Sequence, residues 1–417
     1  MIRRNPLRSV SMFGLALCAT VAGCEVVSGL SDLTFDGRGG GGAGGGCVSS
    51  GGLGGAGGNG QSTSQSSAGG QGGDGGQGGG PVVSALFNQR SRYTCALRGA
   101  DYYCWGQSPD FPPATISPQI LSVPPDTVEG LADETYCVRT SGGELRCWGE
   151  NDLGQLGTGD TTPLSGPDAA ALLPAPVTKA TLSGAVACAI AGATSDAYCW
   201  GDNDDAMVAF PDDGAPHATP ELVALPGPPA PVDQIGAGVY VACARRGTEV
   251  YCWGWNTNGD IGSDVPNGVY PPTLVQTDPA KELAVLGFGA CIVSMSDEAF
   301  CWGNTLFSSP TPVSVPELDG ASQLEGGDLH VCGIKPNGDV TCVGTNAHFE
   351  LGGDTIFEDS ATVEIPGGAA SVVGGYWMSC ALSLTGQVHC WGDNTGGALG
   401  LPHDNGAFSA PQPVNFP

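Results

Sequence analysis

Cysteine is the residue type whose spacing in this chain most clearly indicates chemistry. Fourteen of the 17 cysteines recur as seven pairs, which are Cys95 and Cys104, Cys137 and Cys147, Cys188 and Cys199, Cys243 and Cys252, Cys291 and Cys301, Cys332 and Cys342, and Cys380 and Cys390. Paired thiols can form disulfides or ligate zinc, and zinc sites place cysteines two to four residues apart, beside a second such pair. The separations here are nine to eleven residues, in a chain whose first residues are predicted to be an export signal. Both facts favour disulfides.

The separation within each pair fits a β-hairpin whose two cysteines lie directly opposite each other, three residue pairs from the turn. A separation of nine leaves Gly99-Ala100 or Gly247-Thr248, with glycine first, as a type II′ turn requires. Separations of ten and eleven leave longer turns: Ser141-Gly142-Gly143, Met295-Ser296-Asp297, Pro336-Asn337-Gly338, Leu384-Thr385-Gly386 and Gly192-Ala193-Thr194-Ser195. Opposed residues have Cβ atoms about 4.5–5.5 Å apart, which suits a disulfide.

Other residue types do not form a recognisable catalytic or metal-binding pattern. The five histidines have no metal-ligand spacing: His217, His330, His348, His389 and His403. The sequence has no Gly-x-Ser-x-Gly, His-Glu-x-x-His or phosphate-loop motif. The run 202–205, Asp-Asn-Asp-Asp, could bind calcium, but it lacks EF-hand spacing, and an Asx-rich turn explains it better. We therefore predict no catalytic residue, no metal and no cofactor.

The composition narrows the classes of partner. The 417 residues include 70 Gly and 32 Pro but only 14 Lys and Arg against 42 Asp and Glu, for a net charge of −28. So few cations cannot neutralise a row of phosphates, which argues against nucleic-acid binding and against electrostatic docking on anionic lipid. The abundance of glycine and proline disfavours helices and predicts a loop-rich β protein.

The first 23 residues are predicted to be an export signal. Arg3, Arg4 and Arg8 precede an apolar stretch at 12–22 that is too short to span a bilayer. The stretch ends in Val-Ala-Gly-Cys24, which resembles the lipobox of bacterial lipoproteins, where the cysteine becomes acylated after cleavage before it. The alternative is an ordinary secretory signal with a chance cysteine. The lipoprotein interpretation places the protein in the cell envelope, lipid-anchored and extracytoplasmic.

Residues 24–80 are predicted to be a disordered tether. The segment is dominated by glycine and has no apolar periodicity from which to build a core. Its Cys47 has no partner nearby in the sequence and could form an intermolecular disulfide.

Residues 81–417 contain an internal repeat. The second cysteines of the seven pairs are 43, 52, 53, 49, 41 and 48 residues apart. A period of 40–55 residues in a β-rich chain predicts a propeller with one blade per repeat. Tryptophan follows the second cysteine in six repeats, at Trp105, Trp148, Trp200, Trp253, Trp302 and Trp391, and we expect these side chains to pack between blades.

The full unit, CVRTSGGELRCWGENDLGQLGTGD at 137–160, resembles the regulator of chromosome condensation repeat. The tail of that motif persists at 254–264, 344–354 and 392–400, and Val343 replaces the tryptophan in the sixth repeat. The resemblance implies a seven-bladed β-propeller that makes protein–protein contacts. The founding member of the family is a nucleotide-exchange factor and a secreted bacterial relative inhibits β-lactamases, but neither activity transfers residue by residue.

The ends of the array predict how the ring closes. The last repeat stops after a first strand at 411–414, and the first repeat opens with a second strand at 82–86. We therefore expect one blade to be built from both termini, which would leave no free sheet edge.

The turns that enter each cysteine strand carry varied aromatic residues and are the candidate binding face. These residues are Tyr93, Tyr240, Phe288, His330, Tyr376 and Trp377. Equivalent turns of a propeller gather on one side around the central channel, where they form a common type of binding surface; packing between blades is the alternative.

Together these observations predict a non-enzymatic, lipid-anchored propeller with a monomeric head that binds an unidentified protein partner. There are two alternatives to a binding protein. One is an enzyme with its site at the channel mouth, and the other is a purely structural surface protein.

Overall fold

The computed structural model of the protein describes residues 82–88, 90–107, 115–132, 135–257, 259–303, 308–357, 359–402 and 406–417. All of them belong to one compact unit, Gly76–Pro417. The predicted signal peptide, Cys24, the tether and Cys47 lie outside the described residues, so their assignments stay predictions. No helix in the described part of the chain is long and apolar enough to cross a membrane.

The described chain is built from 27 β-strands and two short 3₁₀ turns, η1 (Pro316–Leu318) and η2 (Thr395–Gly397). The strands form seven antiparallel sheets, which we number as blades 1 to 7 in chain order. Blades 1 to 3 contain β1 (Val83–Phe87), β2 (Tyr93–Arg98), β3 (Asp101–Gly106) and β4 (Thr115–Leu121); β5 (Thr127–Ala132), β6 (Thr135–Thr140) and β7 (Leu145–Gly149); and β8 (Val177–Ser183), β9 (Val186–Ala191), β10 (Asp196–Gly201) and β11 (His217–Leu222).

Blades 4 to 7 repeat the four-stranded pattern. They contain β12 (Gln234–Ala237), β13 (Val241–Arg246), β14 (Glu249–Asn256) and β15 (Gly268–Leu274); β16 (Ala280–Leu286), β17 (Gly289–Ser294), β18 (Ala299–Gly303) and β19 (Ser309–Ser314); β20 (Leu324–Gly326), β21 (His330–Ile334), β22 (Val340–Gly344) and β23 (Ser360–Val363); and β24 (Ala369–Gly374), β25 (Met378–Ser383), β26 (Val388–Asp393) and β27 (Ala407–Pro413). In blade 2 two isolated bridges, Arg146 to Ala170 and Gly149 to Leu164, stand where the fourth strand would be.

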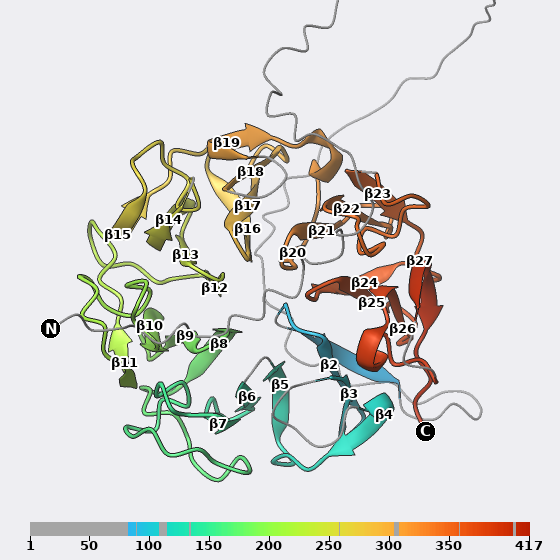
Figure 1. The fold of residues 1–417 in the computed structure, drawn as a ribbon, viewed down its shortest axis with the longest axis horizontal. Helices are drawn as coiled ribbons and strands as arrows, with labels where there is room; N and C mark the ends of the chain where they lie inside the picture. Colours follow the sequence, from blue (N-terminus) through green and yellow to red (C-terminus); the bar gives the residue numbers. More distant parts are fainter. Residues whose placement is uncertain are drawn as a thin grey trace, which may run out of the picture. The chain divides into compact units, whose positions relative to one another are not determined.

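The seven sheets lie in a ring around a common centre, with the first strand of each blade nearest the centre (Figure 1). Buried apolar residues form seven clusters, and each cluster joins side chains of two neighbouring blades. The hydrophobic core is therefore divided among the interfaces between blades, because a single twisted sheet cannot bury its own faces. The predicted all-β, seven-bladed propeller is confirmed.

The predicted cysteine pairing is also confirmed. One disulfide forms in each blade, and the seven bonds join Cys95 with Cys104, Cys137 with Cys147, Cys188 with Cys199, Cys243 with Cys252, Cys291 with Cys301, Cys332 with Cys342, and Cys380 with Cys390. In every pair the two cysteines are directly opposed in the strand register.

The hairpin turns have the backbone conformation that was predicted from the cysteine spacing. The φ angle is +65° at Gly99 and +63° at Gly247, which are first turn positions, and +88° at Gly338, which is a last position. The turns thus set the register that brings the sulfurs together.

Ring closure differs in one respect from the sequence prediction. Every sheet consists of strands that are consecutive in the chain, and β27 pairs with β26 of its own blade, so no blade contains strands from both termini. The prediction of a shared blade was wrong because the proline-rich strand closes the preceding sheet instead of opening the next. The two ends of the array still meet, since Val83, Leu86 and Trp105 of blade 1 share a core with Val373 and Met378 of blade 7.

Candidate functional site

Two sets of segments meet on one side of the propeller, which we call the loop face. They are the entering turns, which join the first and second strands of each blade, and the segments that follow each Cys-Trp-Gly or Cys-Val-Gly triplet. The turns between the two cysteine strands lie at the opposite ends of the strands and define the hairpin face.

The glycine of the triplet positions the entering turn. In blade 4, the Trp255 N–H donates to the Tyr240 carbonyl at 2.8 Å. A Cβ on Gly254 would lie 2.3 Å from that carbonyl oxygen, and Gly254 has a φ of +114°. Only glycine permits so close an approach in this conformation. The Asp393 N–H donates to the Trp377 carbonyl in the same way in blade 7, at 2.9 Å.

An asparagine organises the long segment after the triplet in five blades. Its side-chain oxygen accepts a hydrogen bond from the N–H five residues later, and the donors are Leu156, Val208, Ile261, Leu351 and Leu399 for Asn151, Asn203, Asn256, Asn346 and Asn394. Asn203 belongs to the acidic run 202–205, so this run is part of a turn that an Asn side chain organises.

In blades 3, 4 and 7 the tryptophan of the triplet is hydrogen-bonded to the loop of the preceding blade. The indole N–H groups of Trp200, Trp253 and Trp391 donate to the carbonyls of Gln155, Met207 and Glu350 at 2.9, 2.8 and 3.0 Å. Each accepting residue lies four positions after the motif asparagine. All six triplet tryptophans are buried, which confirms the prediction that they pack between blades.

Backbone hydrogen bonds join the entering turns of five consecutive blades. The bonds run from blade 4 through blades 5, 6 and 7 to blade 1: Val239 N–H to Gly287 O (2.7 Å), Gly287 N–H to Asp328 O (3.0 Å), Asp328 N–H to Gly375 O (3.3 Å) and Tyr376 N–H to Ser91 O (3.1 Å). The predicted gathering of the turns on one face is therefore present across these blades.

Four of the six predicted binding residues lie partly exposed in these turns: Tyr240, Phe288, Tyr376 and Trp377. The rings of Tyr240 and Phe288 meet edge to face with centroids 5.7 Å apart. Trp377 stacks on His348 at 4.0 Å, and the Arg92 guanidinium lies 4.3 Å from the Trp377 ring centroid. The loop face thus carries two aromatic groups, one on blades 4 and 5 and one at the junction of blades 6, 7 and 1.

Tyr93 and His330 are exceptions, because their side chains point into the protein. They are 8% and 1% exposed. Tyr93 packs edge-on against Tyr136 of blade 2, and burial raises its pKa to about 12. Both residues lie two positions before a cysteine, whereas Tyr240, Phe288 and Trp377 lie three positions before one. Side chains alternate along an extended strand, so the one-residue difference turns Tyr93 and His330 inward.

Arg90 was not foreseen as a functional residue. It lies in the entering turn of blade 1, and its guanidinium donates to the carbonyls of Leu182 (3.1 Å), Val285 (3.3 Å) and Ala237, on the first strands of blades 3, 5 and 4. This one side chain therefore reaches across the central channel. The only sequence signal was the length of the turn, 88–92, since the turns of blades 3 to 7 are shorter.

Beside Arg90 the innermost strands enclose a cavity of about 160 Å³. Its charged and amide residues include Glu129, Lys179, Gln234, Glu282 and Glu325. Burial raises the pKa of Glu325, while the positive charges of Lys179 and Arg90 oppose that shift. The described residues that line the cavity include no histidine or cysteine.

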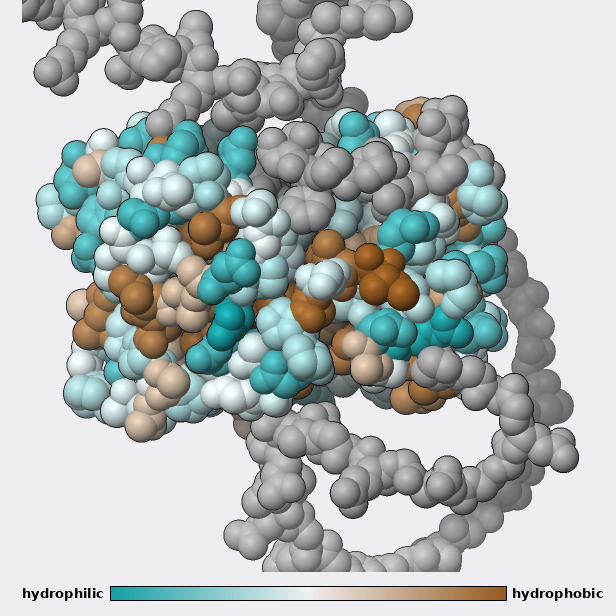
Figure 2. Space-filling view, turned by 90° about the horizontal axis from the view of Figure 1, so that it is seen from below, coloured by the Kyte–Doolittle hydropathy of each residue, from teal (hydrophilic) through white to brown (hydrophobic). Residues whose placement is uncertain are grey.

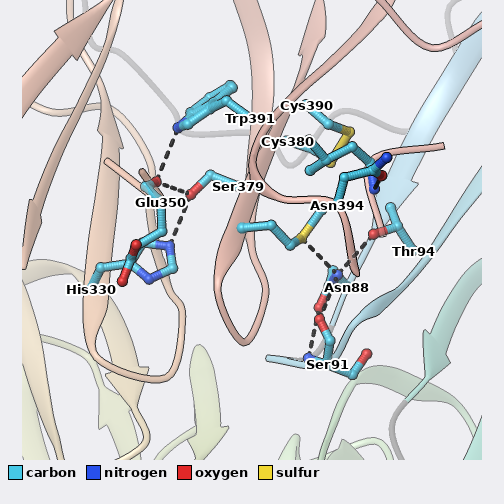
Figure 3. The surroundings of a disulfide bond; sticks show 12 residues. Asn88, Ser91, Thr94, His330, Glu350, Ser379, Cys380, Cys390, Trp391 and Asn394 are labelled. Carbon is cyan, nitrogen blue, oxygen red and sulfur yellow. Dashed lines mark hydrogen bonds between the residues drawn. A yellow bond between two sulfur atoms is a disulfide. The ribbon is translucent and has the colours of Figure 1, made fainter. Parts of the chain in front are cut away.

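A serine and a histidine do form a close pair elsewhere. His330 Nε2 and Ser379 Oγ are 2.9 Å apart, and the serine hydroxyl donates to the Glu350 carbonyl at 2.8 Å (Figure 3). Ser379 is fully buried and Glu350 O also accepts from Trp391. Because the pair is enclosed between blades 6 and 7, a substrate cannot reach it, and the contacts are those of a structural polar cluster.

The burial of His330 predicts acid sensitivity. Burial lowers its pKa to about 4, so between pH 6.5 and pH 4 the unfolded chain takes up a proton that the folded chain does not. This histidine should therefore reduce the free energy of unfolding by on the order of 3 kcal/mol as the pH falls through that window. The test is urea unfolding of the parent and of His330→Gln at pH 7.5, 6 and 4.5. We expect a shallower pH dependence in the variant; equal slopes would contradict the assignment.

Several carboxylates of the loop that follows the blade 3 triplet lie close enough together to repel one another. The pKa of Asp205 is raised to about 6, first by burial and then by the charges of Asp202, Asp204 and Asp212. Among the described residues no group of three or more His, Cys, Asp or Glu side chains is arranged to hold a metal ion.

Comparison with known proteins agrees with this architecture. The profile of the Regulator of chromosome condensation (RCC1) repeat matches residues 369–398. The Ultraviolet-B receptor UVR8 of Arabidopsis thaliana is 22% identical over 65% of this chain and 65% of its own length. The human E3 ubiquitin-protein ligase HERC2 is 22% identical over 64% of this chain, but only 6% of that protein is covered. The chain thus spans less than two thirds of both proteins.

Solved structures share the fold at low identity. Yeast RCC1 (Prp20), in its structure with Kap60, has a TM-score of 0.66 at 17% identity and covers 79% of this chain and 85% of its own. Human WBSCR16 has a TM-score of 0.63 at 17% identity, with 75% of this chain and 89% of its own covered. Similarity at this level supports a propeller of the same type and does not transfer a partner.

Proposed function

We propose that the protein is a lipid-anchored, extracytoplasmic propeller that binds a protein partner through its loop face. The observation that carries the proposal is the set of linked entering turns, which holds four aromatic side chains partly exposed on a rigid ring. Aromatic residues on a preorganised surface are typical of binding sites, because they bury large areas at little entropic cost. Propellers with repeats of this type are mostly binding or exchange-factor modules, which supports the same class.

The seven disulfides support the proposed compartment. Disulfides persist in oxidising environments outside the cytoplasm and are rare inside it. The lipobox-like Val-Ala-Gly-Cys24 supplies the means of anchoring, and acylation with two or more chains holds a protein stably at a membrane.

Replacing Cys24 by serine tests the anchor. We expect Cys24→Ser to abolish acyl labelling and to move the protein from the membrane fraction to the wash, since the anchor would be the acyl chains alone. Labelling with an alkyne fatty acid and fractionation after a high-salt wash measure both effects, and Cys47→Ser is the matched control. If the Cys24→Ser protein remained on the membrane after the wash, the anchor would lie elsewhere.

Affinity capture tests the binding face. The full chain would be used to capture partners from envelope extracts beside two double variants, Tyr240→Ala/Trp377→Ala on the loop face and Met295→Ser/Leu384→Ser on the hairpin face. We expect a stoichiometric partner that the first variant loses and the second retains. Equal capture by both variants would place binding elsewhere, and absence of any partner would favour a structural role.

A further inference from the structure

Four apolar residues lie on hydrogen-bonded segments of blades 4 and 5, and we call them the blade 4/5 patch: Val239, Tyr240, Trp255 and Phe288. The Trp255 N–H donates to Tyr240 O, the Val239 N–H donates to Gly287 O, and the Phe288 ring meets Tyr240. Val239 is 38% and Trp255 40% exposed. The patch is thus fixed by the backbone and open to solvent.

Trp255 is unusual for its position in the repeat. The residue directly after the triplet is polar or acidic in the other six blades, where it is Gln107, Glu150, Asp202, Asn304, Thr345 and Asp393. Packing within the propeller accounts for only part of the Trp255 side chain, because 40% of it remains exposed to solvent. On the outer wall seen in Figure 2, hydrophobic areas alternate with hydrophilic ones.

Segments that carry acidic residues lie on both sides of the blade 4/5 patch. On one side Asp202, Asp204 and Asp205 lie in the blade 3 loop, whose Met207 side chain would be 3.1 Å from a Cβ on Gly254. On the other side the Asp328 carboxylate lies over Gly287, with Oδ1 2.6 Å from where a Cβ would be. The patch therefore lies between two segments of neighbouring blades that carry acidic residues.

The described cations are distributed unevenly. Most belong to the half of a blade next to its hairpin turn: Arg98, Arg139, Arg146, Lys179, Arg245, Arg246, Lys281 and Lys335. On the loop face, Arg90 is bound to backbone carbonyls and Arg92 lies 3.6 Å from Asp393. A ligand at the blade 4/5 patch would therefore approach a face on which the described acidic residues outnumber the described Lys and Arg residues.

We propose that the blade 4/5 patch binds a basic polypeptide segment of the partner. Apolar side chains of that segment pack on Trp255, Tyr240 and Phe288, and its Lys or Arg residues pair with the bordering carboxylates. The inference rests on the proposed function and specifies the chemistry of the partner. Charge complementarity selects a basic segment, because an acidic or neutral one would leave the repulsion among the blade 3 carboxylates unrelieved.

Fluorescence anisotropy with a defined probe tests the proposal. The full chain in non-ionic detergent would be titrated into three labelled peptides of equal length, one of lysine and leucine, one of lysine and glycine, and one of glutamate and leucine. We expect the lysine–leucine peptide to bind most tightly and the glutamate–leucine peptide not to bind. Trp255→Ala should weaken the lysine–leucine peptide about tenfold, as loss of an aromatic anchor does, while Leu384→Ala on the hairpin face should leave its affinity unchanged.

Matched charge variants separate local pairing from net charge. Asp202→Asn/Asp204→Asn/Asp205→Asn should weaken binding about tenfold and flatten its salt dependence. Asp196→Asn/Glu249→Gln/Asp297→Asn removes the same charge from the hairpin face and should change affinity less than about twofold. Equal weakening by both triple variants, or equal binding of all three peptides, would overturn the proposal.

The same probes distinguish failure of this inference from failure of the proposed function. An envelope partner that needs Tyr240 and Trp377, while the lysine–leucine peptide does not bind, overturns the basic-segment inference and leaves the protein-binding function intact. Absence of both peptide binding and any envelope partner overturns both.

Discussion

Replacing Trp391 by alanine is expected to lower the free energy of unfolding by about 3–5 kcal/mol, the usual range for truncating a fully buried tryptophan. The side chain is 0% exposed and belongs to the core between blades 6 and 7, with Leu351 and Val363. Its removal leaves a cavity at that interface, where two separate sheets are held together largely by side-chain packing. Urea unfolding without reductant, followed by both far-UV circular dichroism and fluorescence, measures the loss.

A conservative variant separates packing from hydrogen bonding. Trp391→Phe keeps most of the apolar contact and loses part of the ring together with the indole N–H bond to Glu350 O. That carbonyl still accepts from the Ser379 hydroxyl at 2.8 Å, so it is not left unpaired. We expect Trp391→Phe to cost about 1 kcal/mol. If Trp391→Ala lowered the free energy of unfolding no more than Trp391→Phe does, packing of the tryptophan would not stabilise the interface between the blades.

The sequence predicted the repeat because the chemistry of the blade is local. Disulfide spacing, turn glycines and the triplet lie within a single short unit, and each can be checked against hairpin geometry without knowledge of the rest of the chain. The same locality explains why the blade assignment of the proline-rich strand was wrong. Its sequence fits either the end of one sheet or the start of the next, and the choice depends on which neighbour offers an unpaired edge.

Four of the six residues predicted for the binding face are partly exposed there, and two are buried instead. Tyr240, Phe288 and Trp377 are three residues before a cysteine and face outward, whereas Tyr93 and His330 are two residues before one and face inward. Counting from the cysteine would have separated the two sets, since side chains alternate along a strand. The channel crossing by Arg90 could not be foreseen in this way, because its acceptors lie 92 to 195 residues away in sequence.

The positions of the acidic and basic residues relative to the two faces could likewise be determined only from the fold. The low number of Lys and Arg is visible in the sequence, but their concentration beside the hairpin turns emerges only when the seven registers are aligned. The acidic segments of blades 3 and 6 then lie on either side of the segments that carry Trp255, Tyr240 and Phe288. A negative net charge by itself bears on solubility. The inference of a basic partner depends on where the acidic and basic residues lie in the fold.

Deleting residues 411–417 is expected to lower stability by roughly 3–5 kcal/mol, although the segment looks dispensable in the sequence. Val414 is buried in the core shared by blades 7 and 1, and its N–H donates to Val388 O at 2.9 Å. Phe416 meets Tyr103 and Trp105 of blade 1 at centroid distances of 5.4 and 5.7 Å. The deletion would expose Trp105 and remove strand-pairing partners from β26. We expect a lower melting temperature and more oligomer on gel filtration, with all seven disulfides retained.

Control variants identify which contact closes the ring. Replacing 411–417 by glycine and serine preserves chain length and should be nearly as destabilising as the deletion. Phe416→Ala keeps the strand pairing and should reproduce about half the loss, because it removes only the contact with blade 1. Both ends of the array lie at this junction, so weakening it opens the ring where no covalent connection joins the blades. A deletion protein as stable and monomeric as the parent would show that the shared core of Val83, Leu86 and Met378 closes the ring unaided.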